Sequence, residues 1–313
     1  MKIAITGALG HIGSHMIRIL PDNLVDLEIL MIDNMRTQRY PSLFNLPSKA
    51  KYKFIEADIL NIDLNSCFDG VDIVLHLAAI TDAAGSFQNK KEVEHVNFNS
   101  TLRVAEACCK TGSSMIHLSS TSVYGTQNQI VDEECTQEEL KPQSPYAETK
   151  LKEEKYLAQM AETENLSFIT CRFGTICGVS PGMRFHTAVN KFCWQAVLGQ
   201  PLTVWRTALH QKRPYLTLIE AGEAIKFIIK NRLFDHGIYN ILTENLTVDS
   251  IIQCIRKYIP ILSIQYVDTE IMNQLSYEVL NHKFMNKGFI CREKIEHCIA
   301  NTIKILKNAG SQQ

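Results

Sequence analysis

Residues 1–13 read MKIAITGALGHIG, a short apolar run followed by glycines at positions 7, 10 and 13. Residues 2–6 have the pattern of a buried strand and residues 12–20 that of a helix, so the glycines form the turn between them. Glycines there permit a tight turn, close approach of the backbone to a pyrophosphate, and close packing of the helix on the strand. The helix N-terminus adds free N–H groups and a partial positive charge, so the stretch predicts a phosphate-binding loop.

Asp33 supplies the second half of this signal. It follows the next predicted strand, residues 27–32, and lies about 20 residues after Gly13, which is the spacing of a dinucleotide-binding unit. A carboxylate at this place can accept hydrogen bonds from the hydroxyls of an adenine ribose and would repel a 2′-phosphate. NAD is therefore the predicted cofactor, while Arg36 and Arg39 nearby keep NADP open. The competing interpretation is an ordinary strand–helix turn beside a surface aspartate.

Apolar runs alternate with longer amphipathic patterns through the first half of the chain. Further strands are predicted at 53–56, 71–77, 114–118 and 168–173, and helices at 92–110 and 145–164. Uniformly apolar strands separated by helices indicate a parallel sheet that is covered on both faces. The predicted fold class is α/β: a doubly wound, parallel Rossmann-type sheet with a smaller C-terminal substrate lobe.

The pattern loosens in the second half, where glycines and prolines divide the chain into short elements. Helices are predicted at 221–231 and 248–258, with a strand at 237–242 between them. We assign residues 1–173 to an NAD-binding domain, to which 237–243 is expected to return, and residues 174–313 to a smaller substrate-binding lobe.

The charge balance and the cysteines narrow the class of protein. The 313-residue chain has 32 basic and 33 acidic side chains, so it has no overall positive field for nucleic acid or an anionic membrane. No apolar stretch reaches the roughly 18 residues of a membrane span, and the N-terminus does not have the pattern of a signal peptide. The ten cysteines include no C-x-x-C pair, which favours reduced, mostly buried thiols. We expect a cytoplasmic protein with no metal site and no nucleic-acid or membrane partner.

Hydroxyl groups and a Tyr–Lys pair follow the predicted strands. The strand at 114–118 leads into SSTSVYG at 119–125, and PYAETK at 145–150 begins a helix. Residues just beyond the carboxyl end of a strand line the ligand crevice of an open α/β sheet. Tyr146 and Lys150 are one helical turn apart, so the ammonium group can lower the pKa of the phenol toward the range needed for proton transfer. Ser120 can hydrogen-bond the same substrate oxygen, which completes the predicted catalytic group.

Other polar residues have simpler interpretations. His76 and His117 lie on predicted strands among apolar residues and are interpreted as packed or cofactor-side histidines, not as catalytic bases. The run KEEK at 152–155 is interpreted as a solvated helix surface. Thr81 follows the fourth predicted strand into the crevice and is a candidate contact of a sugar.

Together these segments resemble the extended short-chain dehydrogenase/reductase family, in its NAD-dependent epimerase/dehydratase branch, which acts on nucleotide sugars. The resemblance covers nearly the whole chain. The segments that carry it are TGALGHIG at 6–13, Asp33 with Asn34, Asp58 with Ile59, HLAA at 76–79, Asn97 within VNFNST, SSTSVYG at 119–125 and YAETK at 146–150.

The resemblance implies a role for residues in each segment. The implied cofactor-binding residues are Gly7, Gly10, His11, Ile12, Gly13, Asp33, Asn34, Asp58, Ile59, Leu77, Ala78, Ala79, Asn97, Ser119, Tyr146 and Lys150. Ser120, Tyr146 and Lys150 would be catalytic. Thr81, Ser122, Thr175 and Arg213 would contact the substrate, with the guanidinium of Arg213 on the sugar-nucleotide diphosphate. The helices at 92–110 and 146–164 resemble those that pair into a four-helix homodimer interface.

The chain departs from the pattern of the family at the substrate side. Thr175 stands where sugar-nucleotide epimerases usually have asparagine, and Pro214 stands where an aspartate usually follows the arginine. Members that catalyse 4,6-dehydration typically have an Asp–Glu pair directly after the catalytic hydroxyl. This chain has Thr121 and Ser122 there, which disfavours a dehydratase.

The predicted function is that of an NAD-dependent nucleotide-sugar epimerase. Inversion at C4 would pass through a transient 4-keto intermediate, with Tyr146 as acid and base. The alternative is an NAD(H)-dependent dehydrogenase or 4-ketoreductase that uses the same residues for net oxidation or reduction. A third hypothesis, from a different class, is a catalytically idle NAD-binding regulator on the same fold.

Overall fold

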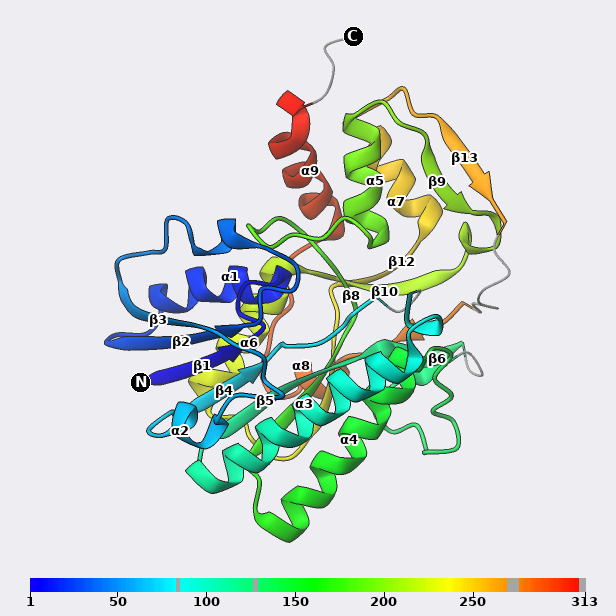
Figure 1. Cartoon of the computed structure of the whole chain (residues 1–313). Helices are drawn as coiled ribbons and strands as arrows, with labels where there is room; N and C mark the ends of the chain where they lie inside the picture. Colours follow the sequence, from blue (N-terminus) through cyan, green and yellow to red (C-terminus); the bar gives the residue numbers. More distant parts are fainter. Residues whose placement is uncertain (83–84, 126–128, 269–275, 310–313) are drawn as a thin grey trace.

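A parallel seven-stranded sheet forms the larger part of the molecule (Figure 1). The computed structural model describes residues 1–82, 85–125, 129–268 and 276–309. The strands of the large sheet are β1 (Lys2–Thr6), β2 (Leu27–Asp33), β3 (Ala50–Glu56), β4 (Ile73–His76), β5 (Ser114–Ser120), β7 (Phe168–Phe173) and β11 (Ile238–Ile241). They follow one another in the order β11-β7-β5-β4-β1-β2-β3, and every neighbouring pair is parallel. The predicted α/β fold class with a Rossmann-type sheet is confirmed.

Helices cover both faces of this sheet. One face carries α1 (His11–Ile19), α6 (Leu218–Asn231) and α8 (His282–Met285), and the other carries α2 (Leu64–Phe68), α3 (Lys90–Thr111) and α4 (Pro145–Glu164). Successive strand residues point to opposite faces, so Ile3 and Ile5 join the core under α1 and α6, while Ala4 joins the core under α3 and α4. This arrangement explains why the strands are apolar throughout.

A second lobe lies above the sheet in Figure 1. Its elements are β8 (Thr175–Cys177), α5 (Ala188–Val197), β9 (Leu202–Trp205), β10 (Lys212–Thr217), β12 (Glu244–Thr247), α7 (Val248–Arg256), β13 (Ile264–Val267) and α9 (Ile295–Leu306). Strands β8, β10 and β12 form one small sheet, and β9 and β13 form another. The three helices share a separate apolar core with these strands, which makes the lobe a distinct packing unit.

Short elements complete the described chain. A two-stranded pair joins β6 (Ile130–Val131) to β14 (Glu278–Val279). Single 3₁₀ turns are η1 (Leu20–Asp22), η2 (Tyr40–Leu43), η3 (Gly85–Phe87), η4 (Thr121–Tyr124), η5 (Arg206–Ala208) and η6 (Lys307–Ala309). No helix in the described part of the chain combines the length and the apolar character that crossing a membrane requires.

The boundary between the two parts is not a single division at residue 173. β11 pairs with β7 in the large sheet, to which residues 237–243 were expected to return. In addition, α6 and α8 fall within the range assigned to the lobe, yet both pack on the sheet. The reason is that Ala221, Ile225 and Ile228 of α6 and Phe284 of α8 belong to the same core as β1 and α1. The C-terminal half thus contributes a strand and two helices to the first domain.

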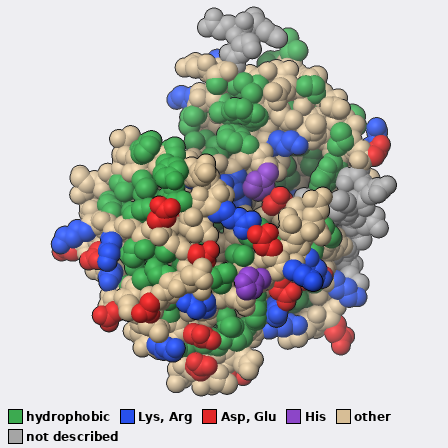
Figure 2. Space-filling view, viewed as in Figure 1, with side chains coloured by type: hydrophobic (Ala, Val, Ile, Leu, Met, Phe, Trp, Pro, Cys, Tyr) green, Lys and Arg blue, Asp and Glu red, His purple; other side chains and the backbone are tan. Residues whose placement is uncertain are grey.

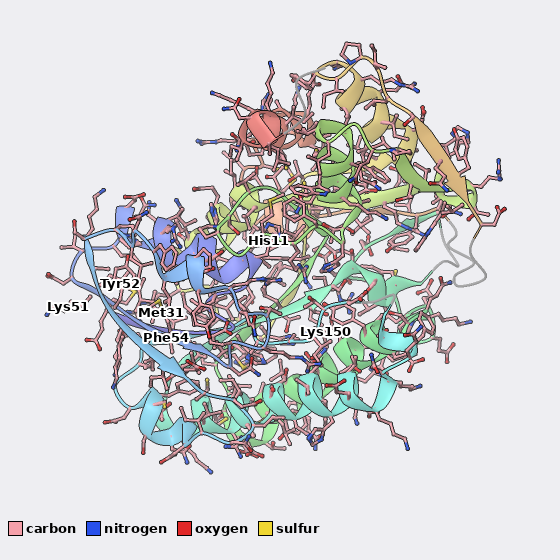
Figure 3. All side chains as sticks on the ribbon, turned by 45° about the horizontal axis from the view of Figure 1, so that its top comes forward. His11, Met31, Lys51, Tyr52, Phe54 and Lys150 are labelled. Carbon is pink, nitrogen blue, oxygen red and sulfur yellow. The ribbon has the colours of Figure 1, made fainter. Side chains whose placement is uncertain are left out.

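Strand β3 begins three residues earlier than the predicted strand at 53–56. Its register with β2 starts at Leu27 and Ala50. On this edge strand Tyr52 and Phe54 pack against the core under α1, and Ile55 packs against the core on the other face, whereas Lys51 is exposed (Figure 3). A lysine on an edge strand opposes pairing with another sheet, and it also interrupts the apolar pattern from which the strand was predicted.

Candidate functional site

The glycine turn is packed too closely for side chains. Gly7 has φ of +65°, its N–H donates to the Ile32 carbonyl at 2.8 Å, and a Cβ on it would lie 2.7 Å from the backbone nitrogen of Ala78. A Cβ on Gly13 would lie 2.5 Å from the carbonyl oxygen of Gly7. Gly10 is the N-cap of α1, so the free N–H groups of the helix begin at this turn. The geometry is that of a backbone cradle for phosphate.

Asp33 lies at the end of β2, beside the turn. Its carboxylate accepts hydrogen bonds from the backbone N–H of Leu9, at 3.0 Å, and of Met35, at 2.9 Å. These bonds hold the acidic group at the edge of the cradle. Arg36 forms an ion pair with Glu92 at 2.9 Å, which engages one of the two arginines that could favour a 2′-phosphate.

The side chain of His11 contacts the residue that follows β8. Its Nε2 lies 2.7 Å from the carbonyl oxygen of Gly178, and burial lowers its pKa to about 3. Residues 178–182 lie against the glycine turn. The Ser180 hydroxyl donates to the His11 carbonyl at 2.8 Å, and a Cβ on Gly182 would lie 2.3 Å from the Leu9 carbonyl oxygen. His11 therefore joins the glycine turn to the segment that leads into the lobe.

The residues after β4 are fixed by two hydrogen-bond networks. The hydroxyl of Thr6 accepts from the N–H groups of Leu77 and Ala78, both at 3.2 Å. The side chain of Asn97 binds the backbone of Ile80 twice, at 2.7 and 2.9 Å. Asn97 thus shapes the loop that contains Ala79.

Further implied cofactor residues lie near the start of α1 and the ends of β2 and β3. Asn34 donates to a carboxylate oxygen of Asp58 at 3.2 Å. Ile59 is buried in the core under α3, and Ile12 packs on the core under α1. The two polar side chains therefore form one pair, and the two apolar ones belong to the cores on opposite faces of the sheet.

The predicted catalytic residues come from β5 and α4. Ser120 ends β5, and its hydroxyl accepts from the N–H of Ser122 at 3.2 Å and from its hydroxyl at 2.9 Å. Tyr146 occupies the first turn of α4, directly after the N-cap Ser144 and Pro145. Lys150 follows one turn later and is only 4% exposed. Figure 3 places Lys150 on α4 and His11 at the start of α1.

The electrostatic surroundings of Tyr146 act in both directions. Burial raises the pKa of the phenol, and the Lys150 ammonium lowers it. Glu153 raises it again, and Arg184 lowers it. The phenol therefore lies within the fields of three charged side chains, two from α4 and one from the segment that leads into α5.

The interpretation of residues 152–155 as a solvated surface is wrong for two of the four. Glu153 is fully buried and Glu154 is 3% exposed. Glu154 binds Arg172 through two bonds, at 2.9 and 2.6 Å, and accepts from the Ser119 hydroxyl at 2.5 Å. Both carboxylates face β5 and β7 because α4 packs on these strands. Ser119, an implied cofactor residue, therefore has its hydroxyl committed to this buried ion pair.

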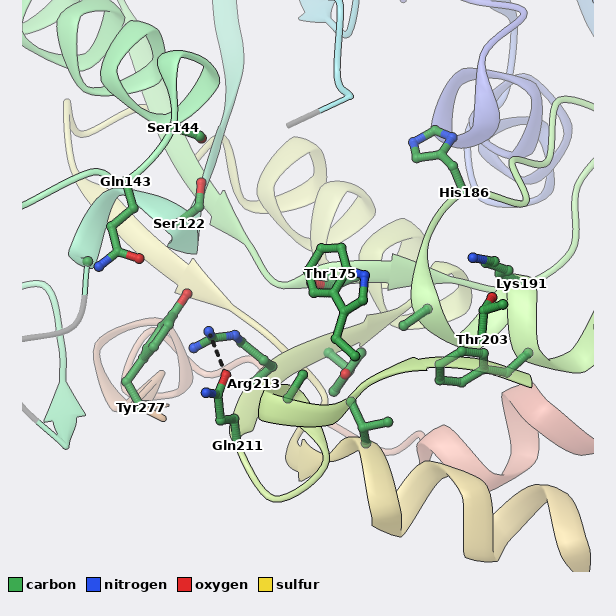
Figure 4. A pocket seen from close by; sticks show the side chains of 17 residues that line it. Ser122, Gln143, Ser144, Thr175, His186, Lys191, Thr203, Gln211, Arg213 and Tyr277 are labelled. Carbon is green, nitrogen blue, oxygen red and sulfur yellow. Dashed lines mark hydrogen bonds between the residues drawn. The ribbon is translucent and has the colours of Figure 1, made fainter. Parts of the chain in front are cut away.

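A cavity of about 350 Å³ opens between the lobe and the end of the sheet (Figure 4). Ser122, Thr175 and Arg213, three of the four predicted substrate contacts, line it together. The fourth, Thr81, is not among the lining residues and accepts a hydrogen bond from Arg184 instead. Figure 2 shows basic and histidine side chains gathered at the hollow between the two lobes.

Several residues of the site were not predicted. Lys191, Trp205 and Tyr277 line the cavity. The guanidinium of Arg213 lies 4.8 Å from the ring centre of Tyr277. Arg184 is buried near Tyr146, and its Nε has no partner among the described residues. Lys191 lies on α5 and Trp205 ends β9, whereas Arg184 and Tyr277 lie outside the helices and strands. None of these segments carries a motif, so only their positions in the fold reveal them.

Comparison with known proteins identifies the family of the chain. The model of the NAD dependent epimerase/dehydratase family matches residues 3–241. The chain belongs to this family. The predicted resemblance is thereby confirmed at the level of the family, which is NAD dependent by its description.

Two curated relatives illustrate the range of the family. A protein of Bacillus subtilis described as an uncharacterized UDP-glucose epimerase is 32% identical over 73% of this chain and 72% of its own length. A trifunctional dehydratase, epimerase and reductase of UDP-sugars from Arabidopsis thaliana is 29% identical over 97% of this chain. This chain spans about half the length of that relative, 47%.

Solved structures share the whole fold. The UDP-glucuronic acid 4-epimerase of Bacillus cereus, solved with UDP-glucuronic acid and NAD, has a TM-score of 0.88 at 23% identity and is matched over 99% of this chain and 100% of its own. The UDP-glucose 4-epimerase of Thermus thermophilus, solved with NAD, has a TM-score of 0.83 at 22% identity, with 99% and 100% covered. At this identity the likeness establishes the fold.

Proposed function

We propose that this chain is an NAD-dependent nucleotide-sugar epimerase that inverts the configuration at C4. The observation that carries the proposal is where the cavity lies. It is bounded by Ser122 and Ser144, the close neighbours of Ser120 and Tyr146, and it contains Arg213 on its far side. A sugar attached to a diphosphate fits this arrangement, with the sugar at the hydroxyl groups and the diphosphate at the guanidinium.

The residues around the glycine turn fit NAD. The side-chain positions of Gly7 and Gly13 are taken by backbone atoms, so the backbone N–H groups at the N-terminus of α1 are accessible to a pyrophosphate. Asp33 stands at the end of β2, where it suits a ribose with free hydroxyls. When bound, NAD would serve as the hydride carrier of the reaction.

Side chains of the protein would transfer the proton and stabilise the charged groups that form during the transfer. Tyr146 takes the proton of the sugar 4-hydroxyl and gives it back after the ring has turned. Lys150 stabilises the phenolate by its charge, and Ser120 donates a hydrogen bond to the sugar oxygen while it is the oxygen of a 4-keto group. The other implied cofactor and substrate residues, Thr81 and Thr175 among them, are part of the same proposal.

Inversion is favoured over dehydration for a specific reason. Thr121 and Ser122 follow Ser120, and neither has an acidic or basic side chain that could remove water from a sugar. The Thr121 hydroxyl donates to the Phe173 carbonyl at 3.3 Å, so it is used within the fold.

The test uses purified protein, NAD and a set of nucleotide sugars. The C4 configuration of the sugar is read by NMR, and NADH is read by absorbance. We expect the C4 epimer to form with no net NADH, and Tyr146→Phe to lower the rate by about 10²–10⁴-fold while the fold is kept. Stoichiometric NADH would indicate a dehydrogenase instead. Binding of NAD with no change in any sugar would support an idle regulator.

We also propose that the protein is a cytoplasmic homodimer. All ten cysteines are free, which suits a reducing compartment. The family resemblance suggests that α3 and α4, which pack side by side, pair with the same helices of a second copy. Light scattering after size exclusion tests the dimer: a mass of one chain at micromolar concentration would contradict it.

A further inference from the structure

The side chain of Lys150 makes a contact that the Tyr–Lys motif does not include. Its Nζ donates to Oε2 of Glu153 at 2.8 Å, one turn along α4. Nε2 of His117 on β5 lies 2.8 Å from the same oxygen. The side chains of Glu153 and His117 are 0% exposed and that of Lys150 is 6% exposed. Lys150, Glu153 and His117 thus meet in the interior of the protein, and Lys150 connects this cluster to Tyr146.

The hydrogen bonds determine where the protons are. Burial lowers the pKa of His117, so its imidazole is neutral near pH 7 and donates from one nitrogen only. The Glu153 carboxylate can only accept a hydrogen bond, and therefore the proton of His117 is on Nε2. Nδ1 is then the acceptor, and the Thr170 hydroxyl lies 3.2 Å from it. Oε1 of Glu153 has no partner among the described residues, so both contacts of the carboxylate use Oε2.

Glu153 keeps Lys150 charged. Burial alone lowers the pKa of the lysine, but Glu153, with smaller contributions from Tyr146 and Glu154, holds this pKa above its usual value. In return, burial alone raises the pKa of Glu153, but Lys150 and His117 outweigh it and hold it at about 2. A buried lysine without such a partner can lose its proton near neutral pH. The pair therefore exists as ammonium and carboxylate across the physiological range.

The other charged groups around the pair leave this balance in place. On β4, His76 faces Lys150, and burial lowers the pKa of this histidine to about 3, so it is neutral. Glu154 is bound by Arg172 of β7, so their charges largely cancel. From the lobe side, Arg184 faces Tyr146. The field at the phenol is then set by Arg184 and by how far Glu153 offsets Lys150.

We propose that Glu153 is a positioning residue that sets the pH range in which Tyr146 transfers protons. It holds the Lys150 ammonium charged and oriented, it offsets part of the ammonium field at the phenol, and His117 fixes the carboxylate in place. The inference rests on the proposed function, in which Tyr146 is the acid and base.

The first test is the pH profile of kcat for Glu153→Gln, which keeps the shape of the side chain. Loss of the carboxylate lowers the pKa of Tyr146 and that of Lys150, so both limbs of the profile should move to lower pH by about one unit. A merely structural role would reduce stability or rate and leave the limbs where they are, which would overturn the proposal. Glu148→Gln is the matched control: Glu148 lies on the same helix and pairs with Lys90 at the surface, so the limbs should stay in place.

The second test reads Tyr146 without turnover. The phenolate absorption is followed during a pH titration, and the spectrum of a Tyr146→Phe protein is subtracted, with and without Glu153→Gln. We expect the phenolate of Tyr146 to form at lower pH when Glu153 is replaced. An unchanged titration in an active epimerase overturns this inference alone, whereas a shifted titration in a protein with no epimerase activity overturns only the proposed function.

The wild-type titration decides the matter if Glu153→Gln does not fold. With the carboxylate present, the Tyr146 phenolate of the protein without ligands should form above the usual tyrosine value of about 10. Formation well below that value would mean that burial and Glu153 together do not outweigh Lys150 and Arg184, and the proposal would be wrong.

Discussion

Gly7 and Gly112 both have a positive φ angle, but the atoms around them differ. Their φ angles are +65° and +74°, yet a Cβ on Gly7 would meet three backbone atoms within 3 Å, whereas one on Gly112 would meet nothing within 4 Å. Both Gly→Ala changes carry the cost of a left-handed residue, about 1–2 kcal/mol. Only Gly7→Ala adds overlap, so we expect it to cost about 2 kcal/mol more and to weaken NAD binding. Urea unfolding and NAD titration measure both; equal losses in the two variants would contradict a close-packed cradle.

Two buried histidines make the protein sensitive to acid. Burial lowers the pKa of His11 and of His76 to about 3, from an ordinary 6.5. The unfolded chain therefore binds these protons first, and the free energy of unfolding should fall as pH drops from about 6.5 toward 3, by about 1.4 kcal/mol per pH unit for each histidine. Above pH 6.5 this contribution is fully present.

The measurement is chemical unfolding at a series of pH values. His76→Gln should reduce the slope between pH 6.5 and 3, because one of the buried histidines that contribute to it is removed. His297→Gln, which changes an exposed histidine on α9, should leave the slope as it is. If the slope of His76→Gln equals that of the unchanged protein, His76 does not stay neutral in the fold.

The Tyr–Lys motif was easier to predict than the buried carboxylates that lie beside it. Tyr146 and Lys150 are separated by one helical turn, so the sequence alone places them on one face. Glu153 and Glu154 lie in a run of four charges, which usually indicates a solvated surface. Their burial depends on histidine and arginine side chains that arrive from β5 and β7. Such pairings join residues 18 and 36 positions apart, and no local pattern announces them.

At the scale of elements, α4 is joined to the sheet by the Glu154–Arg172 ion pair. Removing one partner leaves a buried charge, so Glu154→Gln should lower the free energy of unfolding by about 3–5 kcal/mol. Glu148→Gln breaks the exposed pair with Lys90 on the same helix and should have little effect. Urea unfolding compares the two. Similar losses would mean that the buried pair does not hold α4 in place.

The elements of the first half were predicted well because they are long or uniformly apolar. The helices predicted at 92–110 and 145–164 lie at Lys90–Thr111 and Pro145–Glu164. The lobe was harder, since β9, β10, β12 and β13 are four to six residues long and partly exposed. Each is stable only because it pairs with a strand distant in sequence, and that pairing is a tertiary effect.

At the scale of the whole molecule, the first domain is not a continuous piece of chain. β11 covers the edge of β7, and α6 covers one face of the sheet. A fragment of residues 1–173 would therefore expose a strand edge and an apolar face. We expect it to aggregate or to lack a cooperative unfolding transition, whereas the full chain unfolds cooperatively. Circular dichroism during urea titration tests this. A soluble fragment with a sharp transition would show that 1–173 folds alone.

In the proposed reaction, one site removes the hydrogen on C4 of the sugar and returns it to the opposite face of the same carbon. The most direct measurement follows a nucleotide sugar that carries deuterium on C4, incubated with the protein and NAD, with product analysis by NMR. We expect the inverted product to keep its deuterium on C4, and Tyr146→Phe to form almost no inverted product. Exchange of the label with solvent, or inversion that continues at full rate in Tyr146→Phe, would contradict it.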